Sequence, residues 1–374
     1  MDISVATPLL GAISPQTFMR RHWQKKPLLV RQAVPGGIDL VSRAELFALA
    51  AHEEVESRLV VHREGAWSLR HGPMPRTALP PLKQSRWTLL VQGLDLHVPA
   101  ARALLDRFRF VPDSRLDDAM LSFATDGGGV GPHVDSYDVF LLQARGKRRW
   151  RIARARSREL VPDQPLKILS NFVPEQEYLL EPGDMLYLPP LWAHEGVAQG
   201  ACITASIGFR APGRDEIGGE VLQRMLDAAE APEYDPLYRD PRQAATGTPG
   251  RIPLALSSFA ASSVARMAAD AQGLACALGE VLSDPKAGVQ FDRGSRLAGH
   301  RGIVLDRRTR MMYDDRHVFV NGESFRASGR DATLMRLLAD RRALNANGVG
   351  SLSAEAHELL NQWAAAGWLH AALP

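Results

Sequence analysis

The chain has 374 residues, of which 45% are hydrophobic and 23% are charged. This length and composition predict about two or three folded domains and exclude wholesale disorder. The 45 basic residues nearly balance the 42 acidic ones, which leaves a formal net charge of +3. Such a charge is only a weak indication of an anionic or nucleic-acid-associated setting.

The N-terminal sequence MDISVATPLLGAISPQ lacks the basic start and long apolar stretch of a secretory signal. No uncharged apolar run approaches the roughly 18 residues that a membrane span needs. The two cysteines, Cys202 and Cys276, match neither a disulfide framework nor a metal-binding cysteine pair. We therefore expect a protein of the cytoplasm with two reduced thiols and no membrane contact.

The first hundred residues alternate between helical and extended patterns. Ser14 and Pro15 are typical of a helix start and predict a helix over 14–23, and a second helix is expected over 42–50. The β-branched run that begins at residue 57 and the Glu64–Gly65 turn predict a hairpin over 57–73. A strand at 86–94 and a helix at 100–108 follow.

Between residues 117 and 210 the pattern changes to short strands separated by Pro and Gly. The expected strands are AMLSFA, YDVFLLQ, KRRWRIA, DMLYLPP and CITASIGF, with Gly146 between the second and the third. Short strands with frequent turns predict an all-β barrel or double sheet. The first domain is therefore expected to cover residues 1–212.

The remaining chain is expected to form two further parts. Residues 213–298 have a helical pattern, with an apolar seam over 264–281 that suits either packing within the chain or a helix contact between two chains. Residues 299–374 mix strands, such as HVFVNGE, with helices over 329–341 and 353–367. This mixture predicts a small winged-helix-like α/β domain, which could bind nucleic acid or another protein.

The stretch GGGVGPHVDSYDVFLLQ places His133 two residues before Asp135, at the start of a predicted strand. Residues i and i+2 of a strand point to the same face, so this imidazole and this carboxylate can converge on one ion. The acid-flanked His52 and His62 lie in a helix and at a hairpin turn, where they are expected on the surface. A third ligand is expected from a later strand, and His194 in LWAHEG supplies it. Two imidazoles and one carboxylate form the facial triad of non-haem Fe(II) oxygenases.

The glycine run at 127–129 has two interpretations. It either lets a substrate backbone approach the metal or forms a flexible turn.

The strand KRRWRI has two different faces. One face carries only basic side chains, and the other carries Arg148 together with Trp150 and Ile152. A buried guanidinium needs a partner, which is either a carboxylate of the protein or the distal carboxylate of an acid such as 2-oxoglutarate. Ser206, on a later strand, could add a hydroxyl to the same site.

These motifs resemble the bacterial ribosomal oxygenases of the Jumonji-C family, and among them the arginine hydroxylases of a large-subunit ribosomal protein. The resemblance extends over the first 212 residues and rests on these stretches: RHWQKKP, SRLV, LSFATDGGGVGPHVDSYDVFLLQ, GKRRWRI, EPGDMLYLPP, HEG and SIGFRAP. It implies a mixed fold in which a double-stranded β-helix of the cupin type is followed by a helical dimerisation region and a winged-helix domain.

The resemblance also implies the site and its cofactors. Fe(II) is expected on His133, Asp135 and His194, with Arg148 on 2-oxoglutarate and O₂ as the second cosubstrate. Where the family has a serine near the cosubstrate, this chain has Ala124. The hydroxyl groups expected to compensate are those of Ser122, Thr125 and Ser206.

An arginine of a basic ribosomal protein is the substrate that the resemblance implies, and a homodimer through residues 213–298 is the expected assembly. We expect Tyr137 to pack on the target guanidinium and an acid near the ligands to bind it: Asp126, Asp138 or Glu195. Each acid also has an ordinary structural role open to it, as a turn cap, as the partner of a basic side chain or as a solvated group. Other hypotheses are the same chemistry on a histidyl or methyl-lysyl protein, or a barrel without activity in a nucleic-acid- or protein-binding chain.

Overall fold

The computed structural model describes residues 2–228, 236–297 and 301–372. The chain divides after Ala211 into two compact units, which are described one at a time. In the described part of the chain no helix is both long and apolar enough to cross a membrane.

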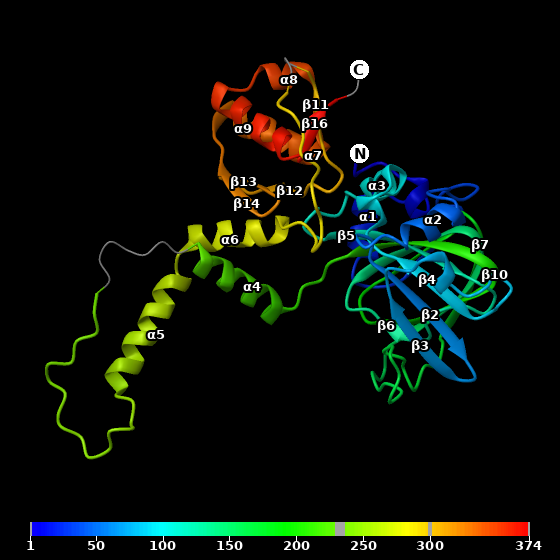
Figure 1. The fold of residues 1–374 in the computed structure, drawn as a ribbon, viewed down its shortest axis with the longest axis horizontal. Coiled ribbons are helices and arrows are strands. Elements are labelled where there is room, and N and C mark those ends of the chain that lie inside the picture. The colour runs from blue at the N-terminus through cyan, green and yellow to red at the C-terminus, as the bar shows by residue number, and fades with distance from the viewer. Residues whose placement is uncertain (1, 229–235, 298–300, 373–374) are drawn as a thin grey trace. The chain divides into compact units, whose positions relative to one another are not determined.

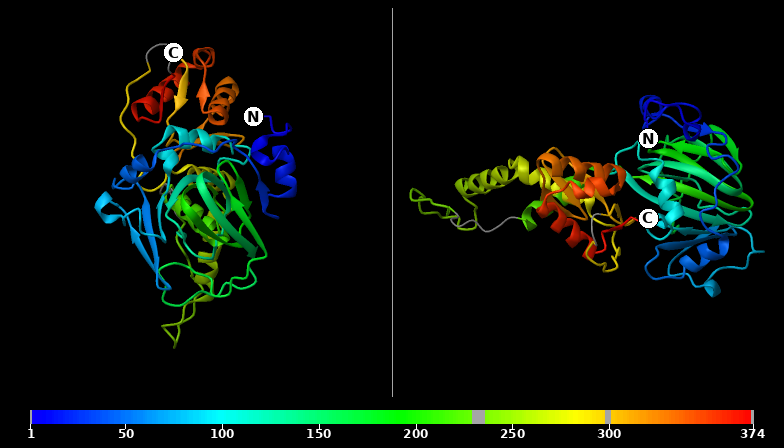
Figure 2. Two further views of the ribbon diagram at one scale, coloured as in Figure 1. Left: turned by 90° about the vertical axis from the view of Figure 1, so that its right-hand side faces the viewer. Right: turned by 90° about the horizontal axis from the view of Figure 1, so that it is seen from above.

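The first unit is built on a ten-stranded antiparallel sheet that curls into a barrel, with three α-helices outside the strands (Figures 1 and 2). The strand order is β1-β9-β7-β10-β5-β4-β2-β3, with β6 paired to β10 and β8 to β7. The helices of this unit are η1 Pro8–Leu10, α1 Pro15–Arg21, α2 Arg43–Leu49, η2 Arg76–Ala78, η3 Leu94–Leu96 and α3 Pro99–Asp106. Its strands are β1 Leu28–Val30, β2 Ser57–Arg63, β3 Ala66–His71, β4 Trp87–Val91, β5 Leu116–Ala124, β6 His133–Val134, β7 Asp138–Arg154, β8 Gln176–Leu180, β9 Met185–Leu188 and β10 Trp192–Phe209. This is the double-stranded β-helix that the sequence predicted.

The predicted hairpin is confirmed, since β2 pairs with β3 across Glu64 and Gly65, both of which have positive φ. The expected turn at Gly146 is wrong, because β7 runs through this residue without a break. Gly146 has a φ of +65°, and a Cβ there would overlap the carbonyl oxygen of Ala201 in β10. The glycine therefore allows close strand contact beside a register shift and does not end the strand.

The core of the first unit lies between the sheet and helices α1–α3. Phe18 of α1 is fully buried and contacts the aromatic rings of Phe140 and Tyr187. Ser14 accepts a hydrogen bond from the Thr17 backbone N–H, which caps α1 as the sequence predicted. Burial of these large rings fixes the outer face of the barrel and leaves the inner face to the site.

The second unit has the expected helical segment followed by a winged helix. Its helices are α4 Arg214–Asp227, α5 Leu254–Ala268, α6 Ala271–Ser283, α7 Gly329–Arg341, α8 Ala346–Gly350 and α9 Ala354–Ala365. Its strands are β11 Ile303–Leu305, β12 Met311–Tyr313, β13 His317–Val320, β14 Glu323–Arg326, β15 Ala343–Leu344 and β16 Leu369–Ala371. They form two three-stranded sheets, β15-β11-β16 and β12-β13-β14.

Two predictions for the second unit are wrong in detail. The seam over 264–281 is not one helix: α5 ends at Ala268, and Asp270 caps α6 by accepting from the backbone N–H groups of Gln272 and Gly273. The stretch HVFVNGE is not one strand, because Asn321 and Gly322 turn the chain between β13 and β14 with positive φ. Part of the helical pattern expected over 213–298, residues 229–235, lies outside the described residues.

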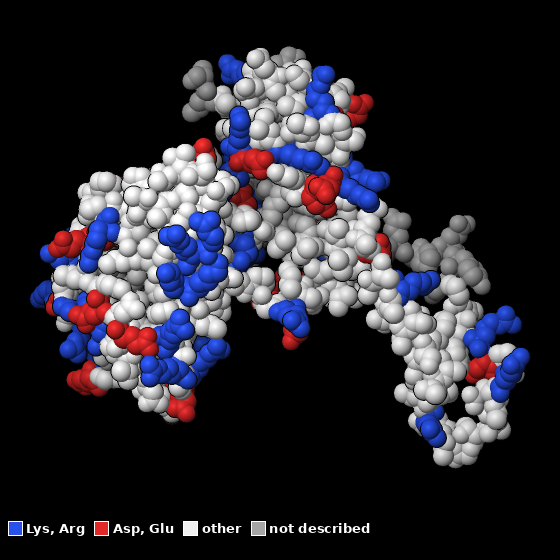
Figure 3. Space-filling model, turned by 180° about the vertical axis from the view of Figure 1, so that it is seen from behind, with Lys and Arg blue, Asp and Glu red and all other residues white. Residues whose placement is uncertain are grey.

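Large apolar side chains are exposed along the helices of this unit. They are Leu222 and Leu226 of α4, Leu254, Leu256, Phe259, Val264 and Met267 of α5, and Leu274 and Leu278 of α6. On the face that Figure 3 shows, the surface of the segment that carries α5 is mostly free of charged groups. Apolar surface of this extent on a helical segment marks an interaction site.

Asp306, which follows β11, is buried within a cluster of basic groups. Burial opposes its ionisation, but hydrogen bonds from Arg308 and from His370 outweigh that effect and lower the pKa of Asp306 to about 2. Because the folded-state pKa lies below the ordinary value of 3.8, this ionised carboxylate stabilises the winged-helix unit above pH 4 and loses that effect as the pH falls toward 2.

Asp306→Asn is therefore expected to destabilise the winged-helix unit by on the order of 1–2 kcal/mol at pH 7. The difference from the unsubstituted protein should shrink as the pH falls from 4 to 2. Hydrogen exchange of the β11 and β16 amides measures it locally, with the exposed Asp315→Asn as control. A difference that is independent of pH would show that the charge of Asp306 is not the cause.

Candidate metal centre

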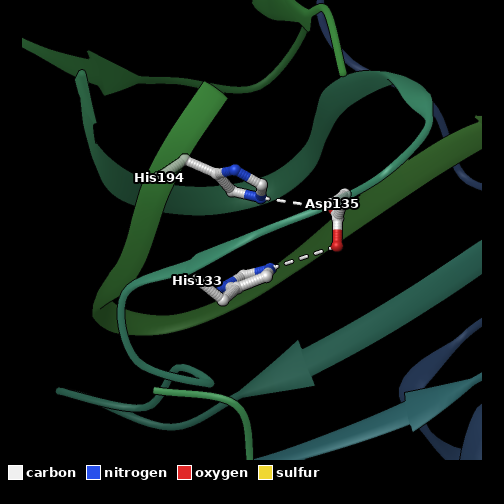
Figure 4. A group of neighbouring side chains, drawn as sticks. All are labelled: His133, Asp135 and His194. Atoms are coloured by element: carbon white, nitrogen blue, oxygen red, sulfur yellow. Dashed lines mark ion pairs between the residues drawn. The ribbon is translucent and has the colours of Figure 1, made fainter. Parts of the chain in front are cut away.

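His133, Asp135 and His194 meet at one end of the barrel (Figure 4). Nε2 of His133 lies 3.8 Å from Oδ1 of Asp135, and Nε2 of His194 lies 3.5 Å from Oδ2 of the same carboxylate. One nitrogen or oxygen from each residue lies within 4.8 Å of the other two. Among the residues that the structure describes, this is the one group of three or more His, Cys, Asp or Glu side chains close enough to hold a metal ion.

The strand pairing explains how residues far apart in sequence come together. β6 pairs with β10 so that His133 lies directly opposite His194. Asp135 follows His133 by two residues and returns to the same face, as strand geometry predicts. The backbone oxygen of Asp135 accepts a hydrogen bond from the N–H of Leu191, which fixes the end of β6 beside the turn that precedes β10.

Both imidazole rings are held by the backbone through the nitrogen that faces away from the centre. Nδ1 of His133 lies 2.9 Å from the Gly131 carbonyl oxygen, and Nδ1 of His194 lies 2.9 Å from that of Trp192. A carbonyl can only accept, so each Nδ1 carries the proton and each Nε2 directs a lone pair to the centre. Burial, reinforced by the neighbouring His133, lowers the pKa of His194 to about 4, which keeps this ring neutral.

The glycines before His133 pack against the chain itself. A Cβ on Gly128 would crowd the backbone oxygens of Trp87 and Thr125, and one on Gly129 would overlap that of Gly196. This packing lets the loop lie close enough to β4 and β10 to place His133, and it does not fit a flexible turn. Gly129 also lines the cavity beside the triad, so an approach of the substrate backbone to this glycine stays a prediction.

A cavity of about 450 Å³ opens from the triad across the inner face of the barrel. Arg148 of β7 lines it and is only 5% exposed. Its Nη1 donates to Oγ of Ser122 at 3.3 Å, while Nε and Nη2 have no hydrogen-bond partner among the described residues. The alternative that a protein carboxylate neutralises Arg148 therefore finds no support in this part of the chain.

The other predicted cosubstrate residues divide into two groups. Ser122 of β5 and Ser206 of β10 line the cavity. Thr125 does not: it is buried, and its hydroxyl bonds the backbone of Trp87. Ala124 is also outside the cavity lining and packs with Ala198 and Cys202.

Tyr137 lines the cavity, but the three acids predicted to act with it do not. Asp126 accepts from the Gly200 N–H in a surface turn. Asp138 is fully buried and binds Tyr187 and Arg115. Glu195 pairs with Arg151. Asp138 therefore has the ion-pair role that the sequence left open, whereas Glu195 is paired and not solvated, and Asp126 bonds β10 and not the glycine turn.

Asp117 and Asp118 of β5 line the cavity although the sequence did not single them out, and Asp118 is only 7% exposed. Its Oδ2 accepts from the Gly93 N–H at 2.8 Å. The signal was present in LDDAMLSFA, where Asp118, Met120 and Ser122 alternate along one strand and all three line the cavity. Burial, together with the charges of Asp135 and Asp118, raises the pKa of Tyr137, so the phenol stays neutral beside these acids.

The donor set fits a divalent metal with open coordination positions. Two neutral imidazole nitrogens and one carboxylate suit Fe(II) and leave room on the cavity side for further ligands. The two unpaired nitrogens of buried Arg148 fit a carboxylate at a second point of the same cavity. These residues therefore suit both a metal ion and an anionic ligand with a carboxylate group.

Comparison with known proteins agrees with this geometry. Residues 103–217 match the model of the JmjC domain, and residues 267–370 match that of the ROXA-like winged helix. Over 215 residues the chain is 44% identical to the ribosomal protein uL16 3-hydroxylase of Escherichia coli. The matched region covers 56% of this chain and 57% of that protein. The chain spans about half the length of the curated relatives it matches.

Solved structures extend the similarity to almost the whole chain. The structure of E. coli YcfD is 30% identical, has a TM-score of 0.82, and covers 95% of this chain and 97% of that one. A structure of YcfD, a ribosomal oxygenase, in complex with cobalt and 2-oxoglutarate is 29% identical over 95% and 97% of the two chains, with a TM-score of 0.78. The chain therefore belongs to the ribosomal oxygenases of the JmjC family.

Proposed function

We propose that this protein is an Fe(II)- and 2-oxoglutarate-dependent hydroxylase of a ribosomal protein. The observation that carries the proposal is the combination within one cavity of the His133, Asp135 and His194 triad with a buried Arg148 that has two unpaired nitrogens. Among the described residues, no protein carboxylate accepts a hydrogen bond from Arg148, so this cation suits an acidic ligand from solution.

The residues have separate roles in this proposal. His133, Asp135 and His194 hold the iron, and Arg148, with Ser122 and Ser206 beside it, binds the distal carboxylate of 2-oxoglutarate. Iron with 2-oxoglutarate and O₂ supplies the oxidation of an unactivated C–H bond. One oxygen atom enters the substrate as a hydroxyl, and the other enters succinate as CO₂ leaves. The chain orients the reactants: the backbone carbonyls behind both rings keep each Nε2 directed at the metal.

The proposed substrate is an arginine of the large-subunit ribosomal protein uL16. The name of the E. coli relative supports uL16 and hydroxylation at a carbon numbered 3. The cavity supports arginine, because Tyr137 offers an aromatic face and Asp118 a carboxylate within it. A ring and an acid together suit a planar cation, which stacks on one and donates to the other. Because the proposed target is a ribosomal protein, the location that we propose for the enzyme is the cytoplasm.

A peptide series tests the arginine pocket. A uL16 peptide with the target arginine should be turned over, while the same peptide with citrulline should lose most activity because its side chain is neutral. A lysine peptide should also be poor, because it lacks the planar fork. Asp118→Asn should lower turnover of the arginine peptide about tenfold or more and reduce the preference over citrulline. The product is measured by mass spectrometry.

Asp126→Asn is the matched control for that series, since Asp126 is an acid near the ligands in sequence but outside the cavity. It should behave as the unsubstituted protein does. Equal turnover of the arginine, lysine and citrulline peptides would contradict the arginine pocket and leave the iron chemistry intact. Turnover of a histidyl or methyl-lysyl peptide alone would transfer the same chemistry to a different target.

The exposed apolar residues of α4, α5 and α6 support a homodimer through residues 213–298. Leu274 and Leu278 of α6 are 42% and 36% exposed, although they lie on the same side of the helix as Ala277 and Val281, which pack against α4. Leu274→Glu with Leu278→Glu should therefore yield monomers in sedimentation while leaving the barrel folded. Gln272→Glu, at an exposed position of the same helix, is the control. A dimer that survives the double substitution would exclude α6 from the interface.

A further inference from the structure

Two buried polar atoms belong to residues that line the cavity and take no part in the proposed binding of iron and 2-oxoglutarate. They are Nε of Arg58 and Oε1 of Gln92, and neither has a hydrogen-bond partner within the described parts of the chain. Both residues line the same cavity as the triad. A buried donor or acceptor without a partner lowers stability, so two of them in one cavity suggest a ligand that pairs with both.

The strand register places the two residues side by side, away from the cosubstrate end. Arg58 of β2 lies opposite Leu90 of β4, and Gln92, two residues after Leu90, returns to the same face. Leu90 in turn lies opposite Ser122 of β5, the residue that accepts from Arg148. Arg58 on β2 and Ser122 on β5 are therefore two strands apart, roughly 10 Å, with Leu90 of β4 between them.

Arg58 and Gln92 line the same cavity as Tyr137 and Asp118. Arg58 therefore belongs to the cavity that we assign to the target arginine. A guanidinium repels another guanidinium, so Arg58 cannot bind the side chain of that substrate residue. The substrate group that it can bind there is an uncharged or anionic acceptor.

One donor and one acceptor side by side match the main chain of a peptide. Each peptide unit carries one C=O and one N–H. When a substrate peptide enters the cavity, both groups lose their hydrogen bonds to water and need partners from the protein. A main-chain contact also serves hydroxylation at a carbon close to the backbone. An arginine held only by its guanidinium can still rotate about its side-chain bonds, whereas an arginine held at both ends presents one C–H bond to the metal.

We propose that Arg58 and Gln92 bind the main chain of the substrate peptide beside the residue that is hydroxylated. Arg58 donates to a backbone carbonyl oxygen, and Oε1 of Gln92 accepts a backbone N–H. This inference rests on the proposed function as far as the identity of the peptide is concerned, and it makes both side chains positioning residues. The guanidinium pocket then provides specificity for the target arginine, while Arg58 and Gln92 align the carbon that is hydroxylated.

The test measures binding of uL16 peptides to the full-length protein by fluorescence anisotropy, without added iron, so that it does not depend on turnover. The peptides are the all-amide form and a set in which one amide N–H near the target arginine is replaced by an ester oxygen. An ester at one position should weaken binding to the unsubstituted protein about tenfold. Gln92→Leu should bind the all-amide peptide about tenfold more weakly and should no longer distinguish that ester.

Gln92→Glu retains an acceptor oxygen and should still distinguish the ester, which separates a lost contact from a disturbed fold. Arg58→Met should weaken binding of every peptide in the set about tenfold, and Arg58→Lys should recover part of the loss. Binding by Gln92→Leu and Arg58→Met equal to that of the unsubstituted protein would overturn the inference. So would an ester penalty that persists in Gln92→Leu at every position.

These outcomes are separate from the fate of the proposed function. Peptides that show the ester coupling but are never hydroxylated would contradict the hydroxylase and leave the main-chain contact standing. Peptides that are hydroxylated but bind equally well to the Gln92 and Arg58 variants would support the hydroxylase and contradict the main-chain contact. An all-amide peptide that the unsubstituted protein does not bind would overturn the main-chain contact together with the uL16 assignment.

Discussion

Replacing His194 by alanine is expected to abolish hydroxylation, with a loss of more than about 100-fold, since removing only a hydrogen-bond partner of a metal ligand already costs 10–100-fold. His194 is one of three residues that form the metal centre, and the described part of the chain offers no cysteine or further acid beside it to replace the ring. The metal content of the purified variant after loading with Fe(II) should fall together with turnover.

The control for this experiment is His71→Ala, which removes an exposed histidine of β3. It should retain full activity and metal content. His194 is only 3% exposed, so its replacement also leaves a small cavity, and thermal unfolding of both variants shows how much of the loss is structural. A folded His194→Ala protein that keeps full activity would contradict the assignment of the triad.

Arg148→Met is expected to raise the 2-oxoglutarate concentration needed for half-maximal turnover about 100-fold or more, because losing a charge-assisted contact to a desolvated carboxylate costs roughly 2–5 kcal/mol. Methionine keeps an apolar stem beside Trp150, over whose ring the Arg148 guanidinium lies at 5.7 Å. The requirement for iron should change little, since Arg148 is not a metal ligand in this account. The measurement is succinate release as a function of 2-oxoglutarate concentration.

Arg149→Met is the matched control for Arg148→Met. Arg149 is the next residue of β7, but it points away from the cavity and pairs with Glu177 on the outer surface. Its replacement should leave the 2-oxoglutarate requirement unchanged. If both variants behave alike, the effect of Arg148→Met is a general loss of charge and not the loss of a binding contact.

The parts of the site that follow strand alternation could be predicted from the sequence. His133 and Asp135 share a face because they are two residues apart, and Arg148 is buried with Trp150 for the same reason. The hairpin over 57–73 was also predictable, because its turn contains Gly65, which tolerates positive φ. In each case the information lies within a few residues of the chain.

Nearness to the ligands in sequence does not decide which acids face the cavity. Glu195 follows His194 directly, and neighbouring residues of a strand point to opposite faces, so Glu195 faces Arg151 on the other side of β10. Asp126 lies in the turn after β5 and accepts a hydrogen bond from the backbone of β10. Asp118, which does line the cavity, is on β5, and only the tertiary pairing of β5 with β10 brings it to the site.

The break between α5 and α6 shows a different limit. The apolar spacing over 264–281 predicted one seam, yet Asp270 begins a new helix within it. The N-cap signal was visible in the sequence, but a periodic apolar pattern that continues across it conceals the end of the first helix. Arg58 and Gln92 could not be found in this way, since their significance depends on the hydrogen bonds that they lack in the folded barrel.

The proposed reaction is a hydroxylation of a ribosomal peptide that is coupled to the decarboxylation of 2-oxoglutarate. The most direct test supplies the Fe(II)-loaded protein with 2-oxoglutarate, the uL16 arginine peptide and ¹⁸O₂, and measures the masses of both products by mass spectrometry. We expect one ¹⁸O atom in the peptide and one in succinate, in equal amounts, and we expect His194→Ala to form neither product. A hydroxylated peptide whose new oxygen comes from water, or a peptide left unmodified by the metal-loaded protein, would contradict the proposed reaction.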